Sequence, residues 1–178
     1  MNMQIGELKF EIMLTSAEIQ QRVNSLAAEI NLAYSDKTPV FIGVLNGCFM
    51  FMADLMKEIT VPCEMSFVKL ASYEGTNQAA ITELIGVGID LKDRDIIIVE
   101  DIVDTGKSLM HTLDALSHVG ARSIQIASLL VKPTCVEFEF PMLTYVGFEI
   151  SREFVVGYGL DLDGKWRNLK DIYKNVPA

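Results

Sequence analysis

Basic residues are scarce in this chain. Its 178 residues include 15 Lys and Arg against 24 Asp and Glu, which gives a formal net charge of −9. Proteins that bind nucleic acids or anionic membranes through a broad surface need a basic face, so the composition argues against both kinds of partner. A small anionic ligand is not excluded, because it requires only a local cluster of donors and a metal ion.

Cysteine, histidine and long apolar stretches are also few. The three cysteines, Cys48, Cys63 and Cys135, form no CxxC pair, and with only two histidines they provide no zinc framework. We interpret the chain as a reduced, cytoplasmic protein. We expect no signal peptide, since no basic segment precedes an apolar block at the N-terminus. The longest uncharged stretch, residues 38–53, is too short to span a membrane.

The composition that remains is that of one globular domain. Hydrophobic residues make up 50% of the chain and charged residues 22%. A chain of this length can bury a sizeable core without a disulfide or a structural metal.

Hydrophobic patterning predicts helices that alternate with buried strands. Thr15 and Glu18 match a capping box, and apolar residues follow at helical spacing over residues 16–34. Further helices are expected at residues 48–59 and from about residue 109 until Gly120 ends the segment. Strands are expected at residues 39–45, 63–71, 82–89, 95–100, 123–131, 144–150 and 154–158.

Short, continuous apolar runs are typical of strands buried on both faces. This pattern predicts an α/β protein whose parallel sheet is covered by helices on both sides. Such sheets bind ligands in the crevice beyond the carboxyl ends of their strands. The sequence therefore indicates a site beside Leu45, Glu100 and Val131.

Residues 99–109 read VEDIVDTGKSL, a strand that ends in acidic residues and leads into a helix. A helix start offers unpaired amides and the positive end of its dipole to an anion, and Gly106 lets a phosphate approach the backbone. The alternative is an ordinary helix start that Thr105 or Ser108 caps. A P-loop is excluded, because its first glycine would fall on Asp101.

Glu100 and Asp101 bring two carboxylates to the ligand-binding edge of the predicted sheet. Adjacent residues of an extended chain point apart, so we expect them to serve neighbouring ribose hydroxyls rather than clamp one ion together. One of them would act through Mg²⁺, which keeps most of its waters when a protein binds it. The alternative is a solvated acidic turn.

The segment at residues 99–109 resembles the 5-phosphoribosyl-1-pyrophosphate signature of the type I phosphoribosyltransferases. Its core, residues 100–106, is most similar to the hypoxanthine (hypoxanthine–guanine) phosphoribosyltransferases. Further segments resemble functional parts of that family in the same order, and the resemblance extends from about residue 10 to residue 172. They are the pyrophosphate loop at residues 44–47, the start of a mobile lid at 72–73, the purine-oxygen site at 130–132, the hood at 147–150 and 154–161, and Arg167.

The resemblance implies purine salvage. The 5-phosphoribosyl group of 5-phosphoribosyl-1-pyrophosphate would pass to a 6-oxopurine base, hypoxanthine and also guanine, giving the nucleoside 5′-monophosphate and pyrophosphate. The implied fold is a Rossmann-like parallel sheet flanked by helices, with a small hood lobe. Residues 1–178 would form a single phosphoribosyltransferase domain, with a core at about 35–140 and a hood built from the N-terminal segment and about 145–178.

The resemblance also implies roles for individual residues. Asp104 would be the catalytic group that accepts the N7 proton of the purine, Lys132 would donate to its O6 and Phe154 would stack on its ring, with Val155 and Asp161 completing the purine site. Mg²⁺ would be bound at Glu100 and Asp101 beside the ribose, a second Mg²⁺ would be bound by Asp161 near the pyrophosphate, and the lid would begin at Ser72 and Tyr73. The site for 5-phosphoribosyl-1-pyrophosphate would comprise Leu45, Asn46, Gly47, Glu100, Asp101, Asp104, Thr105, Gly106, Lys107, Ser108 and Arg167.

Most of these side chains also have an ordinary structural explanation. Asp104 could cap the helix that follows it, a lysine at a strand end is usually exposed, and Phe154 could be hood core. Lys107 is as compatible with a solvated position as with a phosphate contact. The polar segment at residues 72–80 is equally typical of a surface loop.

Two positions depart from the family pattern. Asn46 stands where many relatives carry a lysine, so the pyrophosphate loop lacks that charge. Gly159 stands where alanine is common, and we assign no consequence to that difference. The resemblance also implies a cis peptide bond between Leu45 and Asn46.

Two other functions are alternatives. Some proteins of this fold regulate RNA by binding it, which the net charge argues against. The same reaction with another base is the second alternative, but Lys132 argues against adenine and Phe154 against a pyrimidine. A mean hydropathy of +0.29 and nine methionines indicate apolar surface in contact with a partner, with residues 48–59 in the core or in the interface. The resemblance implies that the partner is a second copy, in a homodimer or homotetramer.

Overall fold

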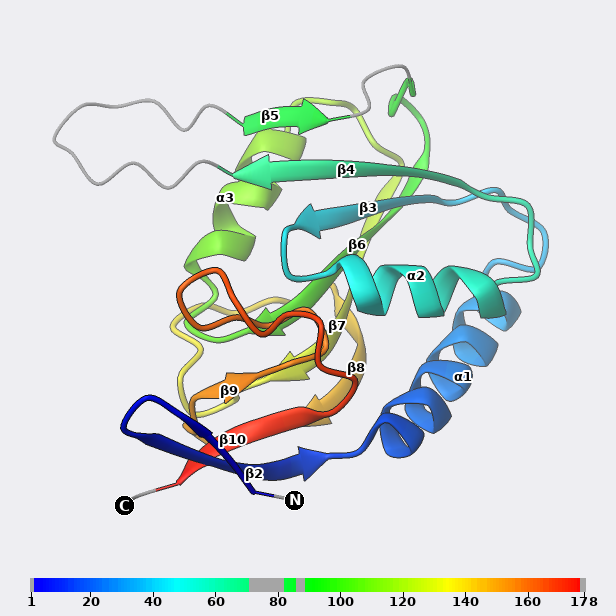
Figure 1. The fold of residues 1–178 in the computed structure, drawn as a ribbon. Coiled ribbons are helices and arrows are strands. Elements are labelled where there is room, and N and C mark those ends of the chain that lie inside the picture. Colours follow the sequence, from blue (N-terminus) through cyan, green and yellow to red (C-terminus); the bar gives the residue numbers. More distant parts are fainter. Residues whose placement is uncertain (1, 71–81, 86–88, 177–178) are drawn as a thin grey trace, which may run out of the picture.

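The structure is a computed structural model that describes residues 2–70, 82–85 and 89–176. Its largest feature is a six-stranded sheet with the order β5-β4-β3-β6-β7-β8 (Figure 1). All neighbouring strands are parallel except β5, which pairs antiparallel with β4. The predicted parallel sheet is therefore confirmed. The strands are Val40–Leu45 (β3), Glu64–Leu70 (β4), Thr82–Ile85 (β5), Asp95–Val103 (β6), Ser123–Val131 (β7) and Leu143–Glu149 (β8).

Helices cover both faces of this sheet because its central strands are apolar on both. Ile97 and Val99 of β6 pack in the same cluster as the apolar faces of α1 (Ser16–Ala33) and α2 (Phe49–Glu58). Ile96 and Ile98 point to the opposite face and pack with Leu109 of α3 (Lys107–Leu116). Helices α1 and α2 lie within one residue of their predicted bounds, whereas α3 begins two residues earlier than expected and ends at Leu116, well before Gly120.

The predicted capping box starts α1. The amide of Glu18 donates to Thr15 Oγ1 at 3.3 Å, and the amide of Thr15 donates to Glu18 Oε2 at 2.8 Å. Hydrogen bonds from the hydroxyl and then the amide of Thr15 lower the pKa of Glu18. The next amide, that of Ser16, donates to Asp171 Oδ1 at 2.7 Å, which ties this helix to the C-terminal part of the chain.

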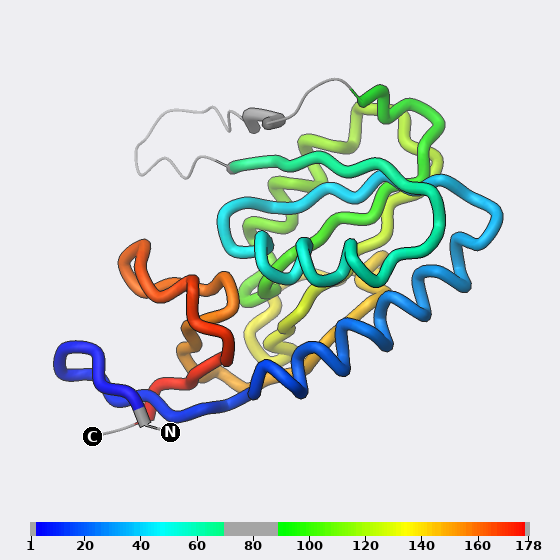
Figure 2. Tube along the Cα trace, turned by 45° about the vertical axis from the view of Figure 1, so that its right-hand side comes forward, coloured from blue at the N-terminus to red at the C-terminus, as the bar shows by residue number. Residues whose placement is uncertain are grey.

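A second, antiparallel sheet with the order β1-β2-β10-β9 forms a small lobe, called the hood below. Its strands are Asn2–Ile5 (β1), Leu8–Leu14 (β2), Val155–Val156 (β9) and Ile172–Val176 (β10). β2 pairs with β10, so the two ends of the chain lie side by side (Figures 1 and 2). Phe10, Val156 and Tyr173 form the small core of the hood.

The expected boundary between core and hood needs a correction. Residues 145–149 belong to β8, which pairs with β7 in the larger sheet, so they are part of the core rather than the hood. Helix α1 also packs on this sheet, which extends the core beyond the expected 35–140. The short strands β1, β2 and β10 were not predicted by the apolar pattern.

The central strand β6 runs past its expected end at Glu100. Ile102 and Val103 pair with Leu130 and Val131 of β7, and these contacts extend the ladder. Glu100 is consequently buried within a strand, so the alternative of a solvated acidic turn is wrong. Among the described residues, no helix is both long enough and apolar enough to cross a membrane.

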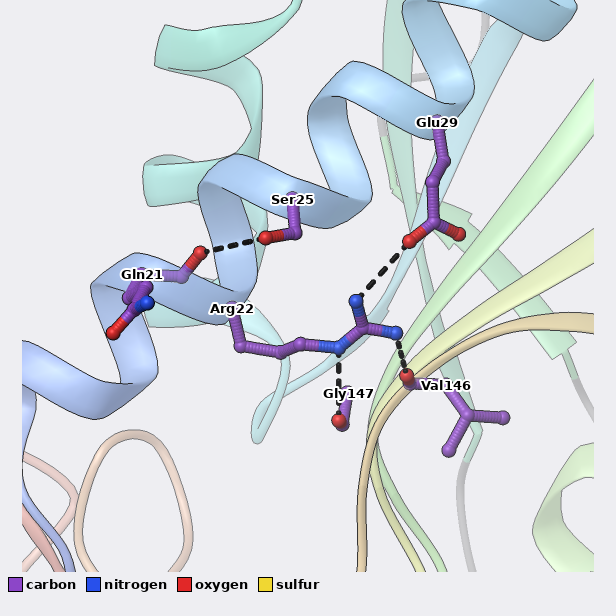
Figure 3. Close-up of polar contacts among 6 residues, drawn as sticks. All are labelled: Gln21, Arg22, Ser25, Glu29, Val146 and Gly147. Atoms are coloured by element: carbon purple, nitrogen blue, oxygen red, sulfur yellow. Dashed lines mark hydrogen bonds and ion pairs between the residues drawn. The ribbon is translucent and has the colours of Figure 1, made fainter.

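One guanidinium group ties α1 to the edge strand β8 (Figure 3). Arg22 Nε donates to the carbonyl of Gly147 at 3.0 Å, and its Nη2 donates to the carbonyl of Val146 at 2.7 Å. Its Nη1 pairs with Glu29 Oε1 at 3.1 Å. Arg22 thus donates to the carbonyls of two consecutive residues of this edge strand.

Replacing Arg22 tests this connection. We expect Arg22→Met to lower the free energy of unfolding by about 2 kcal/mol, because two carbonyl groups lose a charged donor. Urea unfolding would measure the loss. Glu29→Gln is the matched control and should cost less than about 1 kcal/mol, since the ion pair it removes is largely exposed. Equal losses in the two variants would contradict a special role for the carbonyl contacts.

Candidate active site

A cleft of about 340 Å³ opens at the carboxyl ends of β3 and β6. This is the edge at which parallel sheets bind ligands. Three segments far apart in sequence meet in it: the end of β3, the end of β6 with the start of α3, and a hood loop. Its lining residues are Val44, Leu45, Asn46, Gly47, Glu100, Asp101, Ile102, Val103, Asp104, Thr105, Gly106, Ser108, Leu109, Asp161 and Arg167.

The turn between β6 and α3 lines this cleft with residues at the start of the helix. Gly106 is the N-cap residue, with φ of 85°, and no side chain caps the helix there. The N-cap position is thus held by Gly106 and not by Thr105, Ser108 or Asp104. The nearest side-chain contact is long, since the amide of Lys107 donates to Thr105 Oγ1 at 3.4 Å. An uncapped helix start of this kind suits an anion such as phosphate.

An ion pair between a buried lysine and a half-exposed aspartate joins two of the predicted catalytic-site residues. Lys132 Nζ lies 2.7 Å from Asp104 Oδ2, and Lys132 is only 6% exposed. Its amide donates to the carbonyl of Val103 at 2.9 Å, which fixes the end of β7 beside the end of β6. Lys132 is therefore not the exposed strand-end lysine of the alternative explanation.

The turn after β3 is packed tightly against β6 and the hood. The Leu45–Asn46 peptide bond is cis, as the resemblance implied. A Cβ at Gly47 would overlap the carboxylate of Asp101, and a Cβ at Gly159 would overlap the carbonyl oxygen of Gly47. Gly159 also has φ of 101°, so a glycine there allows the hood loop to touch the turn.

Arg167 is held in the cleft by two contacts. Its Nη1 donates to the carbonyl of Gly159 at 2.7 Å, and its Nη2 pairs with Asp161 Oδ1 at 2.7 Å. The other carboxylate oxygen of Asp161 accepts from the amide of Gly164 at 2.7 Å. The guanidinium group is thus oriented before any ligand arrives, and three of its five N–H groups are free of these contacts.

The carboxylates of β6 lie in a poorly solvated place. Burial, and then the nearby charge of Asp101, raise the pKa of Glu100 well above its usual range. Burial also raises the pKa of Asp101 to about 6, against the opposing effect of hydrogen bonds from the amides of Ile102 and Asp101 itself and of the Arg167 charge. Perturbed carboxylates in a cleft are typical of functional sites.

The donor set fits a magnesium ion. Glu100 Oε1 is buried and has no hydrogen-bond partner, and Asp101 and Asp161 line the same cleft. Within the described part of the chain no three acidic, histidine or cysteine side chains converge as a ready-made metal cage. Mg²⁺ does not need one, because it is usually bound by one or two carboxylates, waters and substrate phosphates.

Several predicted site residues lie elsewhere. Lys107 does not line the cleft and pairs with Glu137 Oε2 at 3.1 Å. Phe154 is 45% exposed on the hood, with its ring centroid 6.4 Å from that of Phe10, so it is not hood core. Val155 is buried in β9. Ser72 and Tyr73 lie outside the described residues.

The patterning overlooked two parts of the site. The contact of Gly159 with the turn after β3 was missed, although two glycines flank Tyr158 in the sequence. The segment after Lys132 was also missed, although its alternating aromatic residues Phe138 and Phe140 are visible in the sequence. Both signals are local, but their partners are distant in sequence.

Comparison with known proteins gives consistent results. Residues 11–163 match the family model described as a phosphoribosyl transferase domain. The chain is 38% identical over 170 residues to the hypoxanthine-guanine phosphoribosyltransferase of Bacillus subtilis, covering 94% of each chain. It is 38% identical over 171 residues to the hypoxanthine phosphoribosyltransferase of Salmonella typhimurium, covering 93% of this chain and 95% of that one.

Solved structures agree with these matches. A crystal structure of a hypoxanthine phosphoribosyltransferase from Staphylococcus aureus is similar with a TM-score of 0.84 and 35% identity. The match covers 94% of this chain and 91% of that one.

The raised pKa of Asp101 predicts a pH-dependent stability in metal-free buffer. An ordinary aspartate in the unfolded chain ionises near pH 3.8, whereas folded Asp101 ionises near 6. Between these values the unfolded chain has lost a proton that the folded protein keeps, so a rise in pH favours unfolding. As the pH rises from 4 to 7, we expect the free energy of unfolding of Asp101→Asn to increase by roughly 2–3 kcal/mol relative to that of wild type.

Urea unfolding in the presence of a chelator, repeated across this pH range, would measure the difference. Asp36→Asn removes one negative charge from an exposed position and controls for net charge. A stability difference between Asp101→Asn and wild type that stays constant with pH would contradict the effect of burial.

Proposed function

The chain belongs to the phosphoribosyl transferase domain family, and we propose that it is the member that transfers a 5-phosphoribosyl group to hypoxanthine in purine salvage. The donor is 5-phosphoribosyl-1-pyrophosphate, and the products are the nucleoside 5′-monophosphate and pyrophosphate. The protein is thus a transferase. The named relatives are all enzymes, which does not support the alternative of an RNA-binding regulator.

The observation that carries this proposal is the ion pair of Lys132 with Asp104 beside an uncapped helix start. In a 6-oxopurine, N7 and O6 lie on the same edge of the base. A donor and a proton acceptor held 2.7 Å apart match the neighbouring groups of that edge. The helix start provides amides for a phosphate on the other side of Asp104.

Asp104 is the general base in this proposal. Its carboxylate, half-exposed at the cleft, would accept the proton of N7, so that N9 attacks the ribose C1 as pyrophosphate leaves. Lys132 has three donors and spends one on Asp104, which leaves others for O6. The same donors reject adenine, whose 6-amino group cannot accept them. The exposed ring of Phe154 is available to stack on the base, and Val155 would offer backbone groups to its edge.

The ribosyl donor would occupy the cleft itself. The residues of the turn from Asp104 to Ser108 would bind the 5′-phosphate through amides and hydroxyls. The turn at Leu45–Gly47 and the free N–H groups of Arg167 would bind pyrophosphate. Glu100 and Asp101 would bind the ribose hydroxyls and stabilise positive charge that develops on the ribose as the bond to pyrophosphate breaks.

Magnesium is the cofactor in this proposal. Glu100 or Asp101 would hold one ion through carboxylate oxygens and waters, and Asp161 would hold a second one near the pyrophosphate. When bound, the ion neutralises charge on the leaving pyrophosphate. Asn46 brings an amide rather than a charge to the pyrophosphate loop, so Arg167 is the one cationic side chain among the described residues that line the cleft.

Guanine as a second base, a homodimer or homotetramer and a cytoplasmic location belong to the same proposal. Exposed Phe49 at the start of α2 supports an interface on that helix, whose Met52 is fully in the core. All three cysteines are free, which agrees with a reducing compartment.

Turnover by the wild-type protein and by a variant that lacks the general base Asp104 tests the proposal. Purified protein with Mg²⁺ and 5-phosphoribosyl-1-pyrophosphate should convert hypoxanthine to its nucleotide. Asp104→Asn should lower kcat by about 10²- to 10⁴-fold, because the amide cannot accept the proton. Asp163→Asn, in the same hood loop as Asp161 but absent from the cleft lining, is the control and should keep wild-type kcat. No turnover despite binding of the sugar phosphate would instead favour a regulatory protein.

Base selection tests Lys132 separately. We expect Lys132→Gln to raise KM for hypoxanthine by roughly 10- to 100-fold, because a charged donor to O6 is lost. Relative activity with adenine should rise, because the glutamine side chain offers an acceptor. Steady-state kinetics with hypoxanthine, guanine, xanthine and adenine would measure both effects. An unchanged base preference would exclude Lys132 as the residue that reads O6.

A further inference from the structure

We propose that the segment at residues 133–140, called the brace below, positions the phosphate-binding turn, and that Phe140 is its principal positioning residue. This inference rests on the proposed function, in which the turn at residues 104–108 binds the 5′-phosphate. None of the described residues 133–140 lines the cleft. The brace therefore acts on the turn from outside, without touching the ligand.

Backbone contacts join the brace to both parts of the site. It begins directly after Lys132, and the amides of Cys135 and Val136 donate back to the carbonyl of Lys132 at 2.9 and 3.2 Å. The amide of Glu137 then donates to the carbonyl of Thr105 at 3.0 Å. One short segment thus links the lysine of the purine site to the turn of the phosphate site.

The ring of Phe140 packs against the glycine that starts α3. A Cβ placed on Gly106 would lie 2.6 Å from Phe140 Cε2 and 2.8 Å from its Cζ. The ring therefore fills the space that any larger residue would need. Gly106 has φ of 85°, and this left-handed conformation sets the direction of the amides that follow.

Packing against the hydrophobic core holds Phe140 in place for this contact. It packs against the buried cluster that includes Leu109 and Val131, one from α3 and one from β7. Phe138 lies nearby, with ring centroids 6.2 Å apart, but it is 39% exposed and its Cδ2 is 3.4 Å from the same Cβ position. The two phenylalanines therefore form a matched pair, of which only one makes the close contact.

The ion pair of Lys107 with Glu137 lies on the outer side of the same junction. Both side chains are about half exposed or more, so the pair contributes little to stability. It does explain why Lys107 points to the brace rather than into the cleft. The positioning effect must then come from the ring of Phe140 and from the amide of Glu137.

Phe140→Leu is the variant that separates positioning from folding. Leucine keeps an apolar side chain in the cluster but lacks the Cε2 and Cζ atoms that face Gly106. Phe138→Leu makes the same chemical change at the exposed neighbour and is the matched control. Thermal unfolding would verify that both variants are folded at the assay temperature.

Binding of two products reads out the effect. Inosine 5′-monophosphate carries the 5′-phosphate, whereas pyrophosphate with Mg²⁺ does not use that turn. Calorimetry should show that Phe140→Leu weakens the binding of inosine 5′-monophosphate roughly tenfold or more, because a small displacement of the amides is costly. The affinity for pyrophosphate should stay unchanged. Phe138→Leu should bind both ligands as wild type does.

Other outcomes overturn the proposal. If Phe140→Leu weakens the binding of both ligands equally, the variant is generally destabilised. If the two variants have equal effects on binding, Phe140 is not the principal positioning residue. Wild-type protein that binds inosine 5′-monophosphate but does not turn over hypoxanthine would refute the proposed function alone, and the ratio of affinities would still decide the role of the brace. Failure of wild type to bind the nucleotide would overturn both.

Discussion

Burial of the central strand β6 determines where this protein can carry chemistry. The strand pairs with β3 on one side and β7 on the other, and helices cover both of its faces. Its residues Ile96–Val99 are accordingly apolar and fully buried. Asp95 at its amino end is taken up by contacts with Arg122 and Ser123, whereas Glu100 and Asp101 near its carboxyl end line the cleft.

Burial of Glu100 and Asp101 is itself unfavourable for folding when they are charged. Glu100 is 4% exposed and has an oxygen without a hydrogen-bond partner, and burial raises the pKa of both carboxyls. Replacement by an apolar residue would avoid the cost of burying a charge. Local conflicts of this kind are expected at functional sites, since the rest of the fold must stabilise them.

The hood completes the site through close backbone contact. Gly159 touches the carbonyl of Gly47, and Arg167 reaches back to the carbonyl of Gly159. The hydroxyl of Tyr158 donates to Asp54 of α2 at 2.7 Å, which holds the same hood loop on the core. The loop that bears Asp161 and Arg167 is therefore fixed at two points.

Much of the core could be predicted from local pattern. The helices have amphipathic spacing and a capping box, and the central strands are continuous apolar runs bounded by turns. The motif from Glu100 to Ser108 could be located because its residues are consecutive. The cleft then brings most of them together with the turn after β3.

The parts that could not be predicted depend on distant partners. β1 and β2 have mixed, half-exposed patterns, and they become strands only by pairing with each other and with β10 at the other end of the chain. Nothing local shows that β6 continues through Ile102, because β7 supplies the pairing. The burial of Lys132 and the contact of Phe140 with Gly106 likewise arise only when segments meet.

The charge of the site explains how an acidic protein can select an anionic ligand. Glu100, Asp101, Asp104 and Asp161 stand against Arg167 and Lys132, so with every group ionised the side chains contribute four negative and two positive charges. Both cations are already paired with a carboxylate. They hold their positions and keep free donors, so a ligand can bind without breaking either pair. A diphosphate ester therefore cannot rely on side-chain charge alone. In the proposed function it would also use the amides at the start of α3 and a bound Mg²⁺.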